Sequence, residues 1–294
     1  MNTTTADSYI ARFRQVLQFI DTHLDEDLSV ERLAGVAAFS KYHFHRQFSE
    51  LLGIGVYRYI QMLRLKRAGH QLAFRGDSII DIALQSGYES PEAFSRAFRK
   101  ALGQSPSDFR EQPQWESWHA NHQPSSELRR LHMKPQTSFK DIRIVLFPET
   151  RIAVLEHRGD PQRIGDTVRK FIEWRKLNHL HPRISATYNL LYDDPAAVAA
   201  EDFRMDICAA TDKEIVPNAQ GVIAKTIPAG RCAMLRHAGS DDTLPATVRL
   251  LYAEWLPQSS EELRDFPLFF QRVKFFPDVA EHEAVTDVFL PLKG

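Results

Sequence analysis

The chain has 294 residues, which is enough for two domains that each bury a core. Hydrophobic residues make up 43% and charged residues 26%, an ordinary globular composition that excludes an intrinsically disordered chain. The formal net charge of −1 shows no overall basic surplus. No apolar run approaches the ~18 residues of a membrane span and no secretory leader opens the chain, so we expect a cytoplasmic protein without a membrane partner.

Positive charge is unevenly distributed along the chain. Residues 41–110 hold eleven Lys or Arg against six Asp or Glu, whereas residues 1–40 hold three against six. The local surplus in residues 41–110 favours a nucleic-acid-binding surface in that segment.

Apolar spacing predicts helices throughout the first part of the chain. We expect a helix over residues 9–24 and a short second helix after the N-cap residue Ser29. Ser40 caps a third helix, and an uninterrupted helical pattern covers residues 57–74.

Residues 78–110 are predicted to form a helix-turn-helix. Gly87 ends the first helix, because glycine readily adopts the positive φ found after a helix C-terminus. Ser90 then caps a second helix and Pro91 fits its first position. Two helices joined by a short glycine-containing turn are typical of this motif.

The motif occurs twice. SKYHFHRQFSELLG at residues 40–53 aligns with SPEAFSRAFRKALG at residues 90–103, and the preceding helices align as well. The long helix between the copies spans about 27 Å, near the ~34 Å that separates successive major-groove faces of DNA. One chain can therefore fill two adjacent major grooves of a non-palindromic site.

The outward faces of the second helix in each copy carry polar side chains that can reach base edges and phosphates. Arg46 and Arg96 occupy equivalent positions, and we favour DNA contact over a merely solvated helix face. The predicted DNA-binding residues are Tyr42, His45, Arg46, Glu92, Ser95, Arg96, Arg99 and Lys100.

Three strings in this region resemble the signature of the AraC/XylS family of transcription regulators. They are IA-x-x-x-GY from Ile82, S-x-x-x-FSRAFRK through Lys100, and G-x-SP-x-x-FR through Arg110. The resemblance implies sequence-specific binding to double-stranded promoter DNA, with RNA polymerase as a further expected partner.

Residues 111–138 contain three prolines and show weak periodicity. We therefore expect a DNA-binding domain over residues 1–112, a linker over 113–138 and a second domain over 139–294. Trp115 and Trp118 could dock on the first domain, which the sequence does not decide. The composition of the linker favours a first domain that folds and binds DNA alone.

A second internal repeat, with an offset of eighty, fills the rest of the chain. FPETRIAVLEHRG from Phe147 aligns with IPAGRCAMLRHAG from Ile227. The pattern of each copy predicts a strand, an amphipathic helix and two apolar strands. Two such units can pair into one curved sheet, with helices on one face and a cleft on the other. The predicted fold class is thus multidomain, with an all-α first domain and an α+β second domain.

The second half resembles the GyrI-like effector-binding domain over about residues 140–294. The resemblance is carried by the paired R-x-A-x-L-x-H-x-G strings, by WLP at residues 255–257 and by the closing TDVFLPLK. It implies a small-molecule site between the repeats, and the family's ligands are often aromatic and cationic. Here Phe270 and Gln271 stand where many members carry a glutamate, so we expect a neutral or anionic effector that is apolar or aromatic. The predicted effector-binding residues are Tyr188, Tyr192, Trp255, Phe269 and Phe270.

Other chemistry-bearing residues favour structural roles. His157 and His237 recur at equivalent strand ends, which favours a structural hydrogen bond in each repeat. Cys208 and Cys232 fall on predicted strands without ligand-like spacing, so we expect buried, inert thiols. No catalytic motif is present, and we predict no catalytic residue, metal site or cofactor.

The sequence as a whole predicts a ligand-responsive, non-enzymatic transcription regulator. Two other classes stay open. One is a GyrI-like hydrolase of reactive small molecules, and the other is a module that sequesters a toxic compound without binding DNA.

Overall fold

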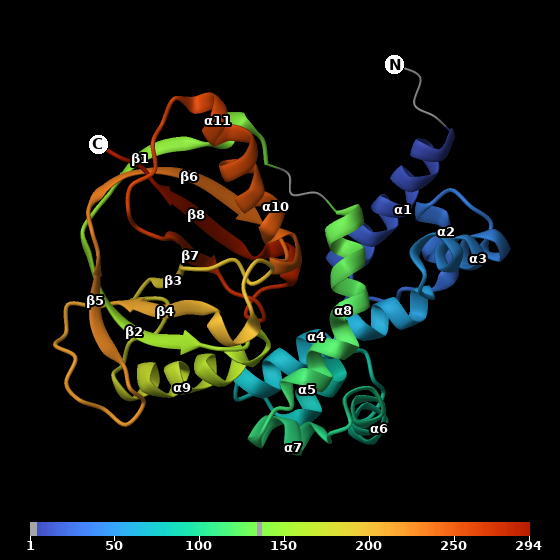
Figure 1. Cartoon of the computed structure of the whole chain (residues 1–294). Coiled ribbons are helices and arrows are strands. Elements are labelled where there is room, and N and C mark those ends of the chain that lie inside the picture. The colour runs from blue at the N-terminus through green and yellow to red at the C-terminus, as the bar shows by residue number, and fades with distance from the viewer. Residues whose placement is uncertain (1–4, 134–136) are drawn as a thin grey trace. The chain divides into compact units, whose positions relative to one another are not determined.

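The computed structural model of the chain describes residues 5–133 and 137–294. The chain forms two compact units, Met1–Lys134 with Ala280–His282, and Pro135–Val279 with Glu283–Gly294. The first unit is helical and the second combines helices with a sheet, which confirms the predicted fold class (Figure 1). In the described part of the chain, no helix is both long and apolar enough to cross a bilayer.

The first unit is built from helices, three of which begin directly after the predicted N-cap residues Ser29, Ser40 and Ser90. The helices are α1 (Thr5–Thr22), α2 (Val30–Val36), α3 (Lys41–Leu52), α4 (Val56–Phe74), α5 (Ile79–Gln85), α6 (Pro91–Leu102), α7 (Pro106–Glu111) and α8 (Trp115–His132). The side chains of Ser29 and Ser90 accept hydrogen bonds from backbone N–H groups in the first turns of α2 and α6. Gly53 and Gly103, with φ of 68° and 77°, end α3 and α6 in the left-handed conformation.

Each helix-turn-helix copy has its own apolar core, and α4 contributes to both. Phe44 and Phe48 of α3 pack in the first core with Tyr59 from the first half of α4. Phe94 and Phe98 of α6 take the equivalent places in the second core. The two copies are therefore rigidly spaced by the single helix that they share.

The prediction of a linker over residues 113–138 is partly wrong, because residues 115–132 form the helix α8. Trp115 and Trp118 are each 5% exposed and belong to the second core, while Leu128 belongs to the first. Pro124 lies inside α8 and many of its residues are polar, so the apolar period is weak. Long-range packing of the tryptophans holds this helix in place. Residues 134–136 of the expected linker lie outside the described residues.

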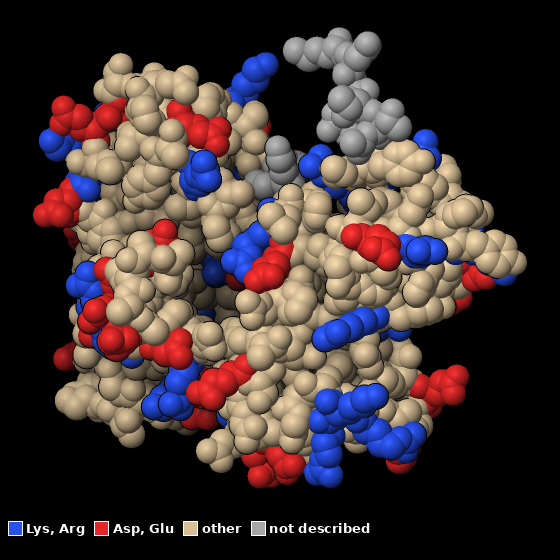
Figure 2. Space-filling view, turned by 45° about the vertical axis from the view of Figure 1, so that its right-hand side comes forward, with Lys and Arg blue, Asp and Glu red and all other residues tan. Residues whose placement is uncertain are grey.

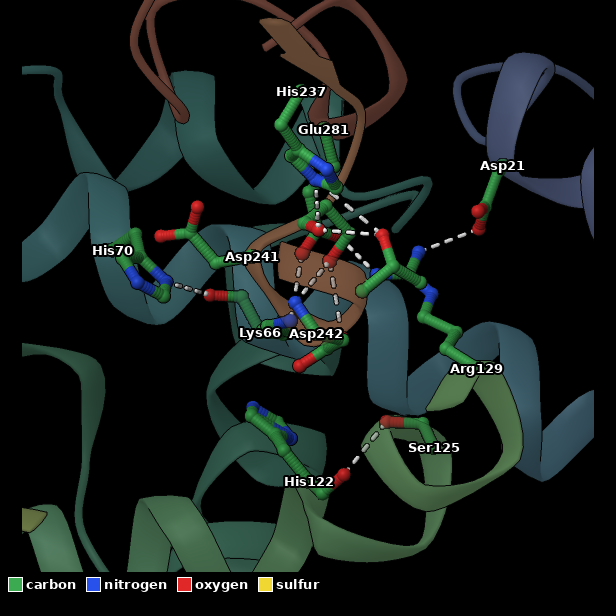
Figure 3. A network of polar contacts seen from close by, with 12 residues as sticks. Asp21, Lys66, His70, His122, Ser125, Arg129, His237, Asp241, Asp242 and Glu281 are labelled. Atoms are coloured by element: carbon green, nitrogen blue, oxygen red, sulfur yellow. Dashed lines mark hydrogen bonds and ion pairs between the residues drawn. The ribbon is translucent and has the colours of Figure 1, made fainter. Parts of the chain in front are cut away.

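A buried ion pair also ties α8 to α1. The guanidinium of Arg129, 1% exposed, donates a hydrogen bond of 2.5 Å to the carboxylate of Asp21, which is 8% exposed (Figure 3). Glu281, whose short segment clusters with this unit, accepts a second hydrogen bond from Arg129. Burial raises the pKa of Asp21, and the charge of Arg129 opposes that rise. Breaking such a pair is costly because it leaves one charge buried without its partner.

Close packing between α4 and α8 requires glycine at position 69. A Cβ on Gly69 would lie 2.4 Å from Nε1 and 2.9 Å from Cδ1 of Trp118. We expect Gly69→Ala to lower the free energy of unfolding by about 1–2 kcal/mol, because displacing the indole outweighs the helix propensity of alanine. Urea denaturation measures this change. Gly35→Ala in α2, where nothing lies within 4 Å of the added Cβ, is the control and should be neutral or stabilising. An equal effect of both substitutions would contradict the packing argument.

The second unit is one eight-stranded antiparallel sheet with the order β1-β6-β8-β7-β3-β4-β2-β5. The strands are β1 (Arg143–Phe147), β2 (Thr150–Arg158), β3 (Thr187–Leu191), β4 (Arg204–Ala210), β5 (Ile223–Ile227), β6 (Gly230–Ala238), β7 (Leu268–Lys274) and β8 (Val285–Pro291). The helices are α9 (Ile164–Leu177), α10 (Leu244–Arg249), which continues as a π-helical segment (Leu250–Trp255), and α11 (Leu256–Ser259). The two predicted strand–helix–strand–strand repeats meet where β3 pairs with β7.

The sheet has two edge strands that were not predicted from the sequence. β1 precedes β2 by a two-residue turn, yet it pairs with β6 of the other repeat. β5 precedes β6 in the same way and pairs with β2. The repeats therefore exchange their edge strands, and residues of one repeat complete the face of the other.

Helices cover one face of this sheet. Phe171 and Trp174 of α9 pack against β2 and β4, and residues of α10 pack against β6 and β8 (Figure 1). The opposite face carries Phe147, Tyr188, Phe269 and Phe289, and we call it the aromatic face.

Candidate DNA-binding face and candidate effector site

The predicted DNA-binding residues all lie on the outward faces of α3 and α6. Seven are exposed and Ser95 is half-buried, whereas the phenylalanines on the inward faces are fully buried. The exposed residues of the predicted set are Tyr42, His45, Arg46, Glu92, Arg96, Arg99 and Lys100. The repeated cores thus place Arg46 and Arg96 at equivalent points of two similar surfaces. Figure 2 shows Lys and Arg side chains gathered at the lower right of the view, on the first unit.

The charged groups on α6 remain available for a ligand. Arg99 lies 3.9 Å from Asp108, and both side chains are more than 60% exposed, so the pair is weak. The pKa of Glu92 is lowered by hydrogen bonds from its own backbone N–H and from Ser90, which keeps its carboxylate ionised. The two helices also differ, since α3 carries Glu50 where α6 carries Lys100. The second copy therefore offers more positive charge to phosphates.

The five predicted effector-binding residues do not share one site. Tyr188 and Phe269 belong to the cluster on the aromatic face, with Tyr192 packed against it. Phe270 and Trp255 lie in the core between the sheet and α10. Successive residues of a strand point to opposite faces, so the neighbours Phe269 and Phe270 cannot both face a ligand. The prediction was wrong in grouping these five residues.

The expected cleft is occupied by aromatic rings. The ring centroid of Phe147 lies 6.0 Å from that of Tyr188, 4.8 Å from that of Phe269 and 5.1 Å from that of Phe289. All four side chains are at most 6% exposed. A ligand that binds between the repeats on this face must therefore displace or rearrange these rings. An open hollow of about 610 Å³ lies elsewhere, beside Arg151, Ile184 and Thr211, and none of the five predicted residues lines it.

A polar cluster adjoins the rings at one end of the aromatic face. The ammonium group of Lys225 donates hydrogen bonds of 2.6 Å to both Glu156 and Asp206, and the hydroxyl of Tyr192 donates one of 2.8 Å to Asp206. Arg158 lies 3.4 Å from Asp206 and 3.2 Å from Glu156. Only Tyr192 of this cluster was predicted as a site residue. Comparing the repeats could have pointed to it, because Glu156 stands where the second repeat has Arg236.

The protonation states of this cluster follow from its contacts. The pKa of Glu156 is lowered by its hydrogen bond from Lys225. Burial lowers the pKa of Lys225, but the hydrogen bonds to Asp206 and Glu156 raise it by more, so the amine stays protonated. Burial and the hydrogen bond to Asp206 raise the pKa of Tyr192 to about 12, so the phenol stays neutral. The cluster therefore holds a fixed ammonium group at neutral pH.

The two repeated histidines have matching structural roles. Nδ1 of His157 lies 2.8 Å from the hydroxyl of Thr167, and Nδ1 of His237 lies 2.8 Å from that of Thr247. Their Nε2 atoms lie close to the backbone oxygens of Asp160 and Ser240. The expected structural hydrogen bond in each repeat is confirmed. Within residues 5–133 and 137–294, no three His, Cys, Asp or Glu side chains are grouped so that they could hold a metal ion.

Cys208 and Cys232 are free, and both are fully buried. Burial raises the pKa of Cys208 well above its usual value and that of Cys232 to about 11, so neither forms appreciable thiolate at pH 8. We expect no labelling of the native chain by iodoacetamide at pH 8 over an hour, and complete labelling of both thiols in 6 M guanidinium. Mass spectrometry of the labelled protein measures this. Rapid labelling without denaturant would contradict the burial of these side chains.

Comparisons with known proteins match both units. Residues 140–293 match the family of the GyrI-like small molecule binding domain, and residues 33–112 match a helix-turn-helix domain. The probable transcriptional regulator YgiV of Escherichia coli K12 is 39% identical over 153 residues, which are 52% of this chain and 96% of that protein. The right origin-binding protein of Escherichia coli K12 is 35% identical over 105 residues, 36% of each chain.

Among solved structures, the DNA-binding domain of AdpA in complex with a target DNA is 31% identical. The match covers 36% of this chain and 97% of the AdpA domain, with a TM-score of 0.32. The match to the GyrI-like family spans more than half of the chain, and the helix-turn-helix precedes it. The chain therefore belongs to the GyrI-like family and, with its AraC-type helix-turn-helix domain, is a DNA-binding transcription regulator.

Proposed function

We propose that this regulator reads a non-palindromic promoter site by placing α3 and α6 in two adjacent major grooves. The duplicated surface is the main support for this proposal, because Arg46 and Arg96 are exposed at equivalent positions on repeated cores. The 19 residues of α4 span roughly 28 Å, which suits the spacing of successive major grooves. Selection of bound fragments from genomic DNA, followed by footprinting, tests this. Two protected segments about one helical turn apart are expected, and a single protected segment would contradict the proposal.

We further propose that the second unit binds an uncharged apolar or aromatic effector on the aromatic face. The ring cluster supplies the apolar surface typical of small-molecule sites. Gln271 pairs directly with Tyr188 in the sheet and so lies on this face, where a carboxylate would be needed to offset the desolvation of a cation. The charged residues at the ends of this face already have partners, as Lys225 and Arg236 do.

A binding experiment with matched probes tests the effector class. We expect 2-naphthol to raise the melting temperature of the chain and a quaternary ammonium probe of similar size to have little effect. Gln271→Glu should improve binding of the quaternary ammonium by about tenfold, because it places a charge beside the rings. Gln258→Glu, at an exposed position of α11, is the control. Tight binding of the cation to the wild-type chain would contradict this assignment.

A further inference from the structure

The two repeats neutralise an equivalent aspartate in different ways. Asp206 of β4 aligns with Asp287 of β8, and Glu156 of β2 aligns with Arg236 of β6. In the second repeat Arg236 lies directly opposite Asp287 and donates two hydrogen bonds to it, of 2.7 and 2.8 Å. In the first repeat the residue opposite Asp206 is Glu156, which carries the same charge.

Like charges directly opposite one another destabilise a sheet, and this pair is partly buried. The side chain of Asp206 is 0% exposed and that of Glu156 is 37% exposed. Lys225 offsets this repulsion from β5, an edge strand that the second repeat contributes to the first, and Arg158 of β2 lies beside the pair, 3.2 Å from Glu156 and 3.4 Å from Asp206. The ammonium group of Lys225 donates to both carboxylates at 2.6 Å. The equivalent position in the first repeat is Val145, so this cation has no counterpart there.

The surroundings of the Lys225 ammonium group have the composition of a binding site for an amine. Two carboxylates accept its hydrogen bonds, and its nitrogen lies 5.7 Å from the ring centroid of Tyr192. Carboxylates and an aromatic ring are groups that recognise organic ammonium ions. The side chain of Lys225 is 28% exposed, so the site reaches solvent.

We propose that Glu156, Asp206 and Tyr192 form a primary-ammonium site that Lys225 fills from within the chain. Lys225 is then a specificity-determining residue, because it excludes external cations from this end of the aromatic face. The ammonium site depends only on these contacts. Its role in selecting effectors rests on the proposed function of the second unit.

Removing the internal ammonium group tests the site in the full chain. Lys225→Ala leaves a space that corresponds to one n-propylammonium ion. We expect n-propylammonium to bind this variant on the order of tenfold more tightly than the wild-type chain, and to raise its melting temperature in calorimetry. The uncharged 1-propanol should not do so. Lys213→Ala, which removes a lysine that donates only to a backbone oxygen in the structure, is the matched control and should show no gain.

A double variant shows whether the carboxylates hold the ion. In Lys225→Ala/Glu156→Gln, the gain from n-propylammonium should be lost, because one of the two charges is gone. If Lys225→Ala does not fold, Lys225→Met keeps the aliphatic packing and vacates only the position of the ammonium nitrogen, so its affinity for the ammonium ion replaces the first measurement. An equal response of the wild type and the variant, or a gain that persists in the double variant, overturns the proposal. Failure of 2-naphthol to bind would instead count against the proposed effector class, and it would leave the ammonium result unaffected.

Discussion

Replacing Arg46 and Arg96 together by alanine is expected to abolish specific DNA binding at concentrations that saturate the wild-type chain. A side chain that reads a base edge contributes about 1–3 kcal/mol of discrimination. Arg46 and Arg96 lie on separate helices with separate cores, so their contributions should add. The double variant should then lose about 2–6 kcal/mol, and each single variant should lose protection mainly over its own half of the site.

Two further variants separate base reading from charge. Lys100→Ala should weaken binding to all sequences alike and reduce the salt slope by roughly one, as expected for a phosphate contact. Arg130→Ala removes an exposed arginine from α8, outside the proposed face, and serves as the control for net charge. Gel-shift titrations at several salt concentrations measure all five variants. If the double variant binds and footprints like the wild type, α3 and α6 are not the reading helices.

The helix-turn-helix copies could be predicted from the sequence because their determinants are local. The caps at Ser29 and Ser90, the glycines that end α3 and α6, and the phenylalanine spacing all act within a few residues. Because the motif occurs twice, the same local determinants appear in both copies, and each copy supports the prediction of the other.

The grouping of residues in the candidate effector site could not be predicted from local sequence, because it depends on strand register. A shift of one residue moves a side chain to the other face of a sheet, and this separates Phe269 from Phe270. The cluster around Asp206 depends on a still more distant relation. Lys225 contacts Asp206 only because the repeats exchange edge strands. The sequences of β1 and β5 have no pattern that predicts this exchange.

The helix α8 was not predicted either, because distant packing contacts rather than a local apolar pattern hold it in place. These contacts bear on whether the first domain folds alone. The sequence favoured a first domain that ends at residue 112. In the structure, the ring of Trp115 lies 5.7 Å from those of both Phe74 and Phe109, and the ring of Trp118 lies 5.8 Å from that of Trp115. A chain of residues 1–112 lacks both tryptophans and would expose the apolar surface of α4 and α7 that they cover.

We expect residues 1–112 to be largely unfolded and residues 1–133 to unfold cooperatively. Burying a large apolar side chain contributes about 1.5–3 kcal/mol, and α8 supplies two tryptophans and Leu128 to the cores. Truncation at residue 112 also removes Arg129 and leaves Asp21 without its buried partner, which costs several kcal/mol more. The total is comparable with the ~5–15 kcal/mol by which a domain is stable.

Circular dichroism and thermal unfolding of the two fragments measure this difference. In the full chain, Trp118→Ala should lower the free energy of unfolding of the first unit by about 3–5 kcal/mol, because it empties a well-packed position against Gly69. Tyr42→Ala, at a side chain that is 80% exposed, is the control and should change stability little. Cooperative unfolding of residues 1–112 at the melting temperature of residues 1–133 would show that α8 contributes nothing to the stability of the DNA-binding unit.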